Sequence, residues 1–257
     1  MSKEVAKTQK QELEAVDMSK YVTDAPKLES LTSHIVIPRI SVAQKMSPAV
    51  DEEKCKVGEF YDFGAEKPLT APGGALQFIP LFVRMVKPEQ KLEGKDWVST
   101  GLVKTVTAKN QKDPWDYEVN GVPHRAKPEL QVYLFLPTQL DNILEAVPYL
   151  FTFKGSSMKK GGNTLYTNLL ITQATAPCFS KIFTMKGIPE KNDKGTFYEV
   201  HVDQQTQKVD PRYFDILHKW SVDLSKLSDI KVIGEDEFHE PAPRASHAPV
   251  TEADVAF

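Results

Sequence analysis

The chain has 257 residues, of which 40% are hydrophobic, and a formal net charge of −3. This length allows a sizeable core within one all-β or α/β domain. Its two cysteines, Cys55 and Cys178, lie far apart and form no Cys-x-x-Cys pair, which argues against a disulfide framework or a cysteine zinc site and for a reduced, cytoplasmic setting. The first twenty residues are charged and no apolar run reaches membrane-spanning length, so we expect neither export nor membrane insertion.

The net charge is distributed unevenly along the chain. Residues 234–257 contain six acidic residues and one basic residue, a charge of −5, so the preceding residues sum to +2. Residues 1–30 contain few large apolar side chains. We therefore expect a disordered or loosely helical arm at 1–30, a folded domain at 31–233 and an acidic, disordered tail at 234–257. A mildly basic body with an acidic tail favours an anionic partner, although a tail that only improves solubility is the alternative.

The folded domain is predicted to be mainly β. Strand-like runs are separated by glycine, proline and polar residues, including a long loop at 63–74 and a polar, proline-bearing stretch at 108–129. This arrangement favours a barrel or sandwich over βαβ units. The predicted strands lie within 33–44, 75–86, 97–107, 130–137, 147–154, 179–187 and 196–203.

Two helices are predicted late in the chain. One begins at about Thr164, and the pair Gly161 and Gly162 argues against helix before it. The other is an amphipathic helix within 210–227, which opens on an Asp-Pro start signal. The apolar faces of the two helices are Leu165, Leu169 and Thr172, and Tyr213, Ile216, Leu217, Trp220 and Leu224.

Enzymatic signatures are absent from the sequence. The segment "GSSMKKGG" at 155–162 lacks the spacing of a phosphate-binding P-loop, and no nucleophile elbow, His-Glu-x-x-His or calcium loop occurs. The six histidines are scattered, and none has a second ligand at metal spacing. We therefore expect no enzyme activity, cofactor or metal, while carboxylates that converge only in space stay undecided.

Basic residues lie beside aromatic residues in two blocks. Residues 84–112 hold seven bases and three acids, and residues 149–194 hold seven lysines and two acids. Single-stranded nucleic acids need this pairing, because cations neutralise phosphates and rings stack on unpaired bases. The small residues between Lys154 and Lys160 would let backbone amides approach phosphates, although a solvated turn is an equal alternative.

Individual roles follow from the polarity around each residue. Strand aromatics such as Phe151 and Phe153 are expected in the core. Rings in polar loops are expected to be exposed, and these are Tyr61, Phe63, Trp115 and Tyr117. The predicted DNA-binding residues are the stacking rings Trp97, Trp115 and Tyr117, with the phosphate contacts Lys104, Lys109, Lys154, Lys159 and Lys160.

The ending "TEADVAF" and the acidic "GEDEFHE" before it resemble the acidic tails, closing on phenylalanine, of bacterial and phage single-stranded-DNA-binding proteins. It departs from the bacterial form at Val255 and Ala256, since that form has a proline before the phenylalanine. Segments 37–64, 76–85 and 148–170 are similar to phage-encoded proteins of DNA replication. The resemblance implies an OB-like β-barrel with insertions whose open face holds single strands.

The same resemblance implies function and partners. The protein would bind single-stranded DNA without sequence preference, in phage DNA replication, recombination and repair in the host cell cytoplasm. It would self-associate on DNA and recruit replication or recombination proteins through Asp254 and Phe257. Two alternatives stay open: a virion structural or scaffold protein, and a host-takeover adaptor that acts through the tail.

Overall fold

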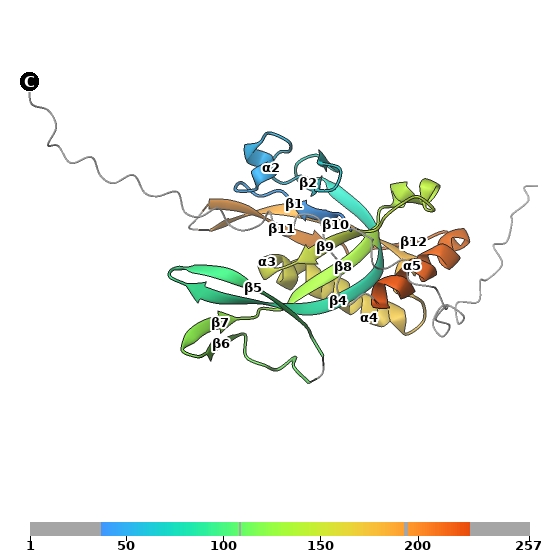
Figure 1. Ribbon diagram of the computed structural model, residues 1–257. Coiled ribbons are helices and arrows are strands. Elements are labelled where there is room, and N and C mark those ends of the chain that lie inside the picture. The colour runs from blue at the N-terminus through green and yellow to red at the C-terminus, as the bar shows by residue number, and fades with distance from the viewer. Residues whose placement is uncertain (1–36, 108, 193–194, 227–257) are drawn as a thin grey trace, which may run out of the picture.

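The computed structural model of the protein describes residues 37–107, 109–192 and 195–226 (Figure 1). The predicted arm at 1–30 and tail at 234–257, with Asp254 and Phe257, lie outside the described residues. Within the described ranges, no helix is both long and apolar enough to cross a membrane.

The described residues form one twelve-stranded sheet. Seven of its strands overlap the predicted apolar runs, and two short hairpins, β2–β3 and β6–β7, and the two-residue strand β12 are added. The strands are β1 (Arg39–Val42), β2 (Phe60–Asp62), β3 (Lys67–Pro68), β4 (Ala75–Glu93), β5 (Asp96–Thr105), β6 (Asp116–Val119), β7 (Val122–Arg125), β8 (Glu129–Phe135), β9 (Tyr149–Phe153), β10 (Lys181–Asn192), β11 (Gly195–Val202) and β12 (Gln207–Lys208).

The sheet is open rather than closed. Its main path runs β11-β10-β4-β8-β9-β1-β2-β3, with β5 and β7 paired to β4, β6 to β7, and β12 to β10. All pairs are antiparallel except β1 with β9. Among the described strands, no pairing joins β11 to β3. The prediction of a mainly β protein is confirmed, whereas a closed OB-like barrel is not.

Strand β4 belongs to two parts of the molecule. Its first part pairs with β10 and β8, and its last part pairs with β5 and β7. Register shifts accompany Pro80 and Pro88, where the ring nitrogen cannot donate to a neighbouring strand. We call residues 87–125, which contain the end of β4 with β5, β6 and β7, the wing; it extends from one side of the sheet in Figure 1.

The β6–β7 hairpin lies in a stretch that was predicted to be a loop. Asn120 and Gly121 both have positive φ, 52° and 76°, as a two-residue type I′ turn requires. An Asn-Gly pair is the strongest short-range hairpin signal in a sequence, and here it sits between two valines. The prediction of a loop was wrong because the surrounding prolines and charges outweighed this signal.

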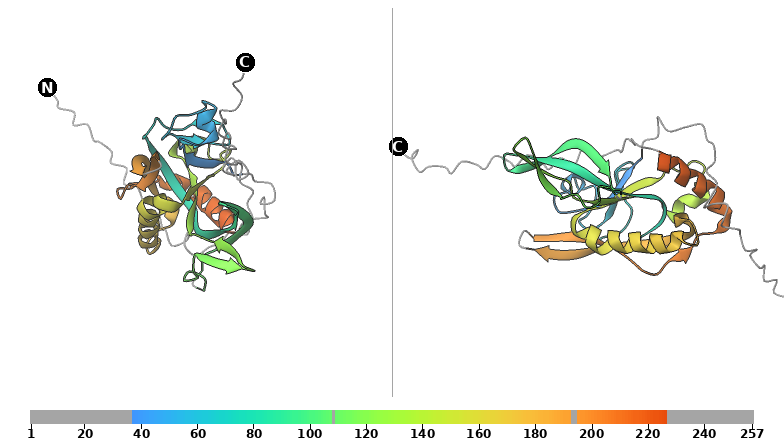
Figure 2. Two further views of the ribbon diagram at one scale, coloured as in Figure 1. Left: turned by 90° about the vertical axis from the view of Figure 1, so that its left-hand side faces the viewer. Right: turned by 90° about the horizontal axis from the view of Figure 1, so that it is seen from below.

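Helices cover one side and one end of the sheet (Figures 1 and 2). The α4 and α5 helices bury the faces that the sequence predicted, with Leu165, Leu169 and Thr172 buried in α4 and Leu217 and Leu224 in α5. The helical elements are α2 (Pro48–Asp51), η1 (Pro137–Asn142), α3 (Gly155–Ser157), the π-helical η2 (Met158–Gly162), α4 (Asn163–Gln173), η3 (Cys178–Ser180), η4 (Pro211–Tyr213) and α5 (Phe214–Lys226).

The glycine pair Gly161–Gly162 lies inside a continuous helical run from 155 to 173, not before a helix as predicted. A Cβ on Gly161 would overlap the carbonyl oxygen of Val200 in β11. On Gly162 it would lie 2.6 Å from the sulfur of Met158. These glycines let the helical run approach the edge of β11, and that contact outweighs their low helix propensity. Figure 2 shows α4 alongside the β10–β11 hairpin.

A large apolar core fills the space between the curled sheet and the helices, and it includes Phe151 and Phe153 as predicted. A smaller cluster lies beneath α2. Tyr61 is buried there and packs edge to face on the half-buried Phe63, with ring centroids 5.0 Å apart. The predicted exposure of these two rings was wrong, because α2 and its flanking turns cover them. Both cysteines are buried and free.

The close approach of Gly161 to β11 gives a stability prediction. Gly161→Ala should lower the free energy of unfolding by roughly 1–3 kcal/mol, since the new methyl group meets backbone rather than a movable side chain. Asn163→Ala, at an exposed position of the same helical run, is the control. Urea denaturation measures both, and a Gly161→Ala protein as stable as the wild type would contradict the packing.

Candidate nucleic-acid interface

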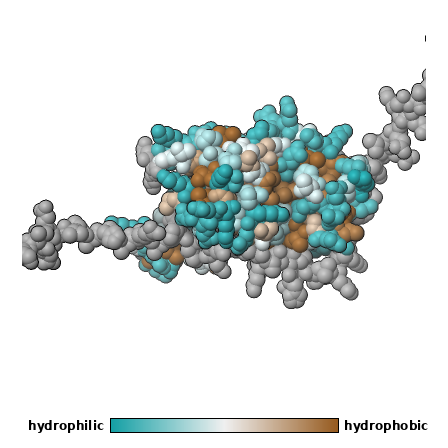
Figure 3. Space-filling view, turned by 90° about the horizontal axis from the view of Figure 1, so that it is seen from above, coloured by the Kyte–Doolittle hydropathy of each residue, from teal (hydrophilic) through white to brown (hydrophobic). Residues whose placement is uncertain are grey.

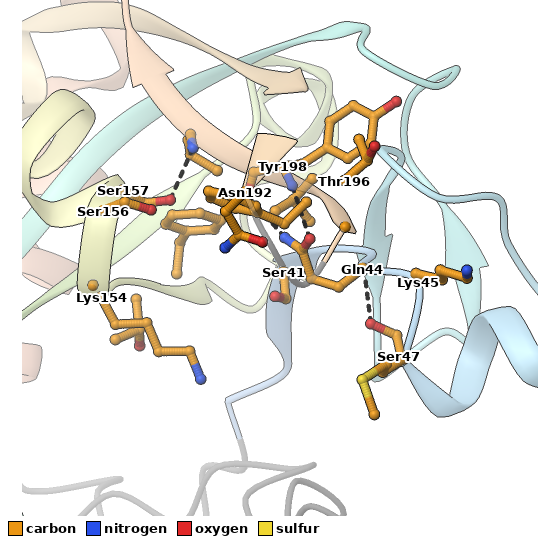
Figure 4. Close-up of a pocket in the computed structure, with 18 of the residues that line it drawn as sticks. Ser41, Gln44, Lys45, Ser47, Lys154, Ser156, Ser157, Asn192, Thr196 and Tyr198 are labelled. Carbon is orange, nitrogen blue, oxygen red and sulfur yellow. Dashed lines mark hydrogen bonds between the residues drawn. The ribbon is translucent and has the colours of Figure 1, made fainter. Parts of the chain in front are cut away.

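A pocket of about 530 Å³ lies where the two ends of the curled sheet approach each other. It is formed by β1 and the turn after it, the end of β9, the start of α3, and the β10–β11 hairpin. Most of its lining side chains are polar (Figure 4). Those that the following argument uses are Arg39, Gln44, Lys45, Met46, Lys154, Ser157, Thr196, Phe197 and Tyr198.

Gln44, which follows β1, is hydrogen-bonded to the edge strand β11 across this pocket. Its Nε2 donates to the carbonyl oxygen of Tyr198, and the Tyr198 N–H donates to its Oε1, both at 2.9 Å. Tyr198 lies opposite Pro189 in β10, which has no N–H, so the backbone groups of Tyr198 face the outer edge of β11. The Gln44 amide therefore takes the place of a neighbouring strand at this position.

A second side chain from the helical run binds the same edge. The Val200 N–H donates to Ser157 Oγ at 2.9 Å. Together the two side chains satisfy edge groups of β11 that strand pairing leaves open, which also protects the edge from pairing with another chain. The free edge of β11 is thus covered by the side chains of Gln44 and Ser157 instead of by another strand.

The pocket is electropositive. Arg39, Lys45 and Lys154 line it, and among the lining residues that the structure describes none is Asp or Glu. Burial raises the pKa of Glu129 on β8, and the positive charges of Lys154 and Arg39 oppose that rise.

Backbone donors add to this charge. Residues 155–157 line the pocket and form the first turn of the helical run to 173, where N–H groups have no acceptor within the helix. The partial positive charge of a helix start favours anions. The approach of backbone amides in "KGSSMKK" to phosphates stays a prediction; the segment contains the start of this helical run. Figure 3 views the α2 side of the molecule and shows hydrophobic areas between larger hydrophilic ones. Met46, which lines the pocket, is 77% exposed.

The predicted DNA-binding residues fall into two groups. Lys154 lines the pocket, while Lys159 and Lys160 follow on η2, exposed and outside the pocket lining. The remaining residues, all in the wing, are Trp97 and Lys104 on β5, Lys109 in the loop after it, Trp115 immediately before β6, and Tyr117 on β6.

The three predicted stacking rings differ in their accessibility. Trp115 is 49% exposed. One face of Trp97 is covered by the guanidinium of Arg125, 4.3 Å from the ring centroid. Tyr117 stacks on His124 at 5.7 Å, and burial together with Glu89 raises the pKa of its hydroxyl. Trp115 is therefore the best placed of the three to stack on a base.

The two groups lie at the same level of the sheet. Leu130 pairs with Phe153, Glu129 with Val86, and Val86 with Thr105. Lys154, the residue after Phe153, therefore lies level with Thr105, about three strand spacings or roughly 14 Å away. Lys104, the residue before Thr105, projects from the opposite face of β5. The register thus brings the wing level with the pocket residue Lys154 without aligning the two lysine side chains.

Sequence reasoning missed Arg39, Gln44 and Lys45. Their segment was predicted as a strand and its end, and no local pattern indicates that β11, more than 150 residues later, lies opposite. Only the curl of the whole sheet brings the two together. The stacking of Arg125 on Trp97 was missed for the same reason, because Arg125 lies on β7 and Trp97 on β5, and both strands pair with β4.

The family comparison matches this chain over residues 8–225 to the model for Pam3 phage gp34-like protein. Because the match covers most of the chain, the protein belongs to this bacteriophage family. The description of the family names no enzymatic activity. Neither the curated proteins nor the solved structures contain a significant match.

The Gln44 bridge should contribute measurably to stability. Gln44→Ala removes two hydrogen bonds to a half-buried strand edge and should cost roughly 1–3 kcal/mol. Asn110→Ala is the matched control, because Asn110 also makes two hydrogen bonds to backbone, both of them exposed, so water replaces them. Urea denaturation gives the free energies, and hydrogen exchange should quicken at the Tyr198 amide. Equal losses in the two variants would show that the bridge does not hold the sheet ends together.

Proposed function

We propose that this protein binds single-stranded DNA without sequence preference and protects and organises single strands in phage DNA replication and recombination. The observation that carries the proposal is the pocket with Arg39, Lys45 and Lys154 and, among the lining residues that the structure describes, without a carboxylate. A concave site whose described charges are all positive selects an anionic ligand. Phosphate is the anion that cations, hydroxyl groups and helical N–H donors bind together.

A single strand suits the site better than a duplex or a free nucleotide. A volume of about 530 Å³ is the size of a small-molecule pocket and too small for a duplex. Phe197 and Met46 line the same pocket as the cations and offer apolar surface to an unpaired base. The wing, which carries Lys104 and the exposed Trp115, begins level with the pocket residue Lys154 and supports a ligand longer than one nucleotide.

The proposal needs no closed barrel. In an OB-like fold the strand lies across a curved sheet, and here a curled sheet whose ends are joined by Gln44 offers a comparable surface. The acidic tail has the charge to compete for this surface, and Asp254 and Phe257 are proposed to recruit replication or recombination proteins. Self-association along DNA is part of the same proposal.

Fluorescence anisotropy with labelled oligonucleotides tests the proposal. Single strands should bind more tightly than duplex of the same length, with little dependence on sequence, and log K should fall linearly with log salt concentration. Equal affinity for the duplex, or affinity that does not change with salt concentration, would contradict the proposed function.

Lys154 should contact phosphate. Lys154→Ala should weaken binding to all sequences alike and reduce the salt slope by about one. The matched control is Lys208→Ala, because Lys208 is exposed and pairs with Lys181, at the opposite end of β10 from the pocket residue Asn192. Equal effects of the two substitutions would show that only net charge matters and would exclude a specific contact at Lys154.

Trp115 should stack on a base. Trp115→Ala should weaken single-strand binding by roughly 1–3 kcal/mol, with little loss of stability because the ring is half exposed. Tyr166→Ala removes an exposed ring from α4 and is the control. Unchanged affinity in Trp115→Ala would restrict the DNA site to the pocket.

One observation favours the alternative of a virion structural or scaffold protein. The wing exposes Leu102 (57%) and Val103 (55%) on β5, together with Val119 and Val122 beside the β6–β7 turn. Exposed apolar side chains on a protruding hairpin favour contact with another protein. Light scattering separates the alternatives: assembly without DNA that is lost in Leu102→Ser/Val103→Ser supports the structural role.

A further inference from the structure

Three side chains with metal-binding atoms meet on the β10–β11 hairpin, away from any motif in the sequence. Glu199 and His201 are two residues apart on β11 and therefore project from the same face. Glu190 on β10 lies opposite Phe197 and so shares that face, diagonally across from Glu199. One carboxylate oxygen from each glutamate and one ring nitrogen of the histidine lie within 4.8 Å of one another.

Two of these atoms lack hydrogen-bond partners although they are buried. Glu199 is only 6% exposed, and neither its Oε2 nor Nε2 of His201 makes a hydrogen bond. The two atoms are 3.6 Å apart, beyond hydrogen-bond distance but close enough for an ion pair when His201 is protonated. A buried carboxylate without a hydrogen bond is costly, and a cation bound between these atoms would offset that cost.

Nearby protein cations do not supply this charge directly. Lys186 lies opposite His201 in the hairpin, but its Nζ is 3.4 Å from Asp203. That ion pair already balances the lysine. The carboxylates of Glu190 and Glu199 carry the remaining negative charge of this face.

We propose that Glu190, Glu199 and His201 bind a first-row divalent transition-metal ion, of which Zn²⁺ is the best fit. Imidazole and carboxylate together suit Zn²⁺, whereas Mg²⁺ and Ca²⁺ prefer oxygen ligands alone. With ligand bonds of about 2.0–2.2 Å, two atoms on one tetrahedral zinc lie roughly 3.4 Å apart. The observed 3.6 Å between Glu199 and His201 needs little adjustment.

The bound metal has a defined structural effect and an open ligand position. Three protein ligands leave the fourth position to water, as in catalytic zinc sites. The ion joins β10 to β11 near the end of the hairpin, whose Asn192 and Thr196 line the basic pocket. The inference stands independently of DNA binding, since it depends only on the three ligands and their burial.

Metal binding can be measured on the full-length chain after chelation. Calorimetry should show that one equivalent of Zn²⁺ binds at these three ligands. When the free Zn²⁺ concentration is 100 times Kd, the ratio of folded to unfolded protein should rise about 100-fold. Mg²⁺ at the same concentration should produce no shift in thermal unfolding. Co²⁺ should give the visible absorption of a tetrahedral site.

Variants separate this site from adventitious binding at other histidines. His201→Gln and Glu199→Gln should each lose the site-dependent equivalent and the thermal shift, whereas Glu145→Gln, which removes an exposed carboxylate outside the hairpin, should keep both. Glu199→Gln also removes a buried charge, so the metal-free variant should remain folded by circular dichroism. Zn²⁺ binding that is unchanged in both ligand variants, absent in the wild type, or matched by Mg²⁺ would overturn the proposal.

Discussion

The pairing of β4 with four neighbours is the constraint on which the rest of the structure depends. This strand holds β10 and β8 in the body and β5 and β7 in the wing. Its prolines, Pro80 and Pro88, coincide with register shifts that interrupt an otherwise long ladder. Because one strand serves both parts, the register of the body sets the level at which the wing begins. The position of the wing level with the pocket residue Lys154 follows from this shared strand.

Local patterns predicted most of the elements. Apolar runs located the strands, and helical periodicity identified the buried faces of α4 and α5. The errors have physical causes: β4 continues through Pro88 because the proline sits at a register shift, and Gly161 lies within a helical run because close approach to Val200 outweighs propensity. The β6–β7 turn was predictable from Asn120 and Gly121. The open form of the sheet was not, because closure depends on how far all the strands curl.

The candidate site was less predictable than the fold. Lys154 and the small residues after it were identified, since glycine and serine beside lysine are a local signal for phosphate binding. Arg39, Gln44 and Lys45 reach the pocket only because β1 and β11 approach each other. The cluster around His201 is similar, because spacing along the chain gives no metal motif and only the register of β10 with β11 adds Glu190. Sites assembled across strands depend on topology, which local sequence patterns do not contain.

The central claim is that one DNA strand contacts both the pocket and the wing. Tryptophan fluorescence during titration with oligothymidylates of increasing length tests it most directly, because Trp115 is half exposed in the wing whereas the cations lie in the pocket. The account predicts that short oligomers bind weakly, and that affinity rises and fluorescence is quenched once a strand is long enough to reach from Lys154 in the pocket to Trp115 in the wing. Affinity that is independent of length, with unquenched fluorescence, would contradict a shared path.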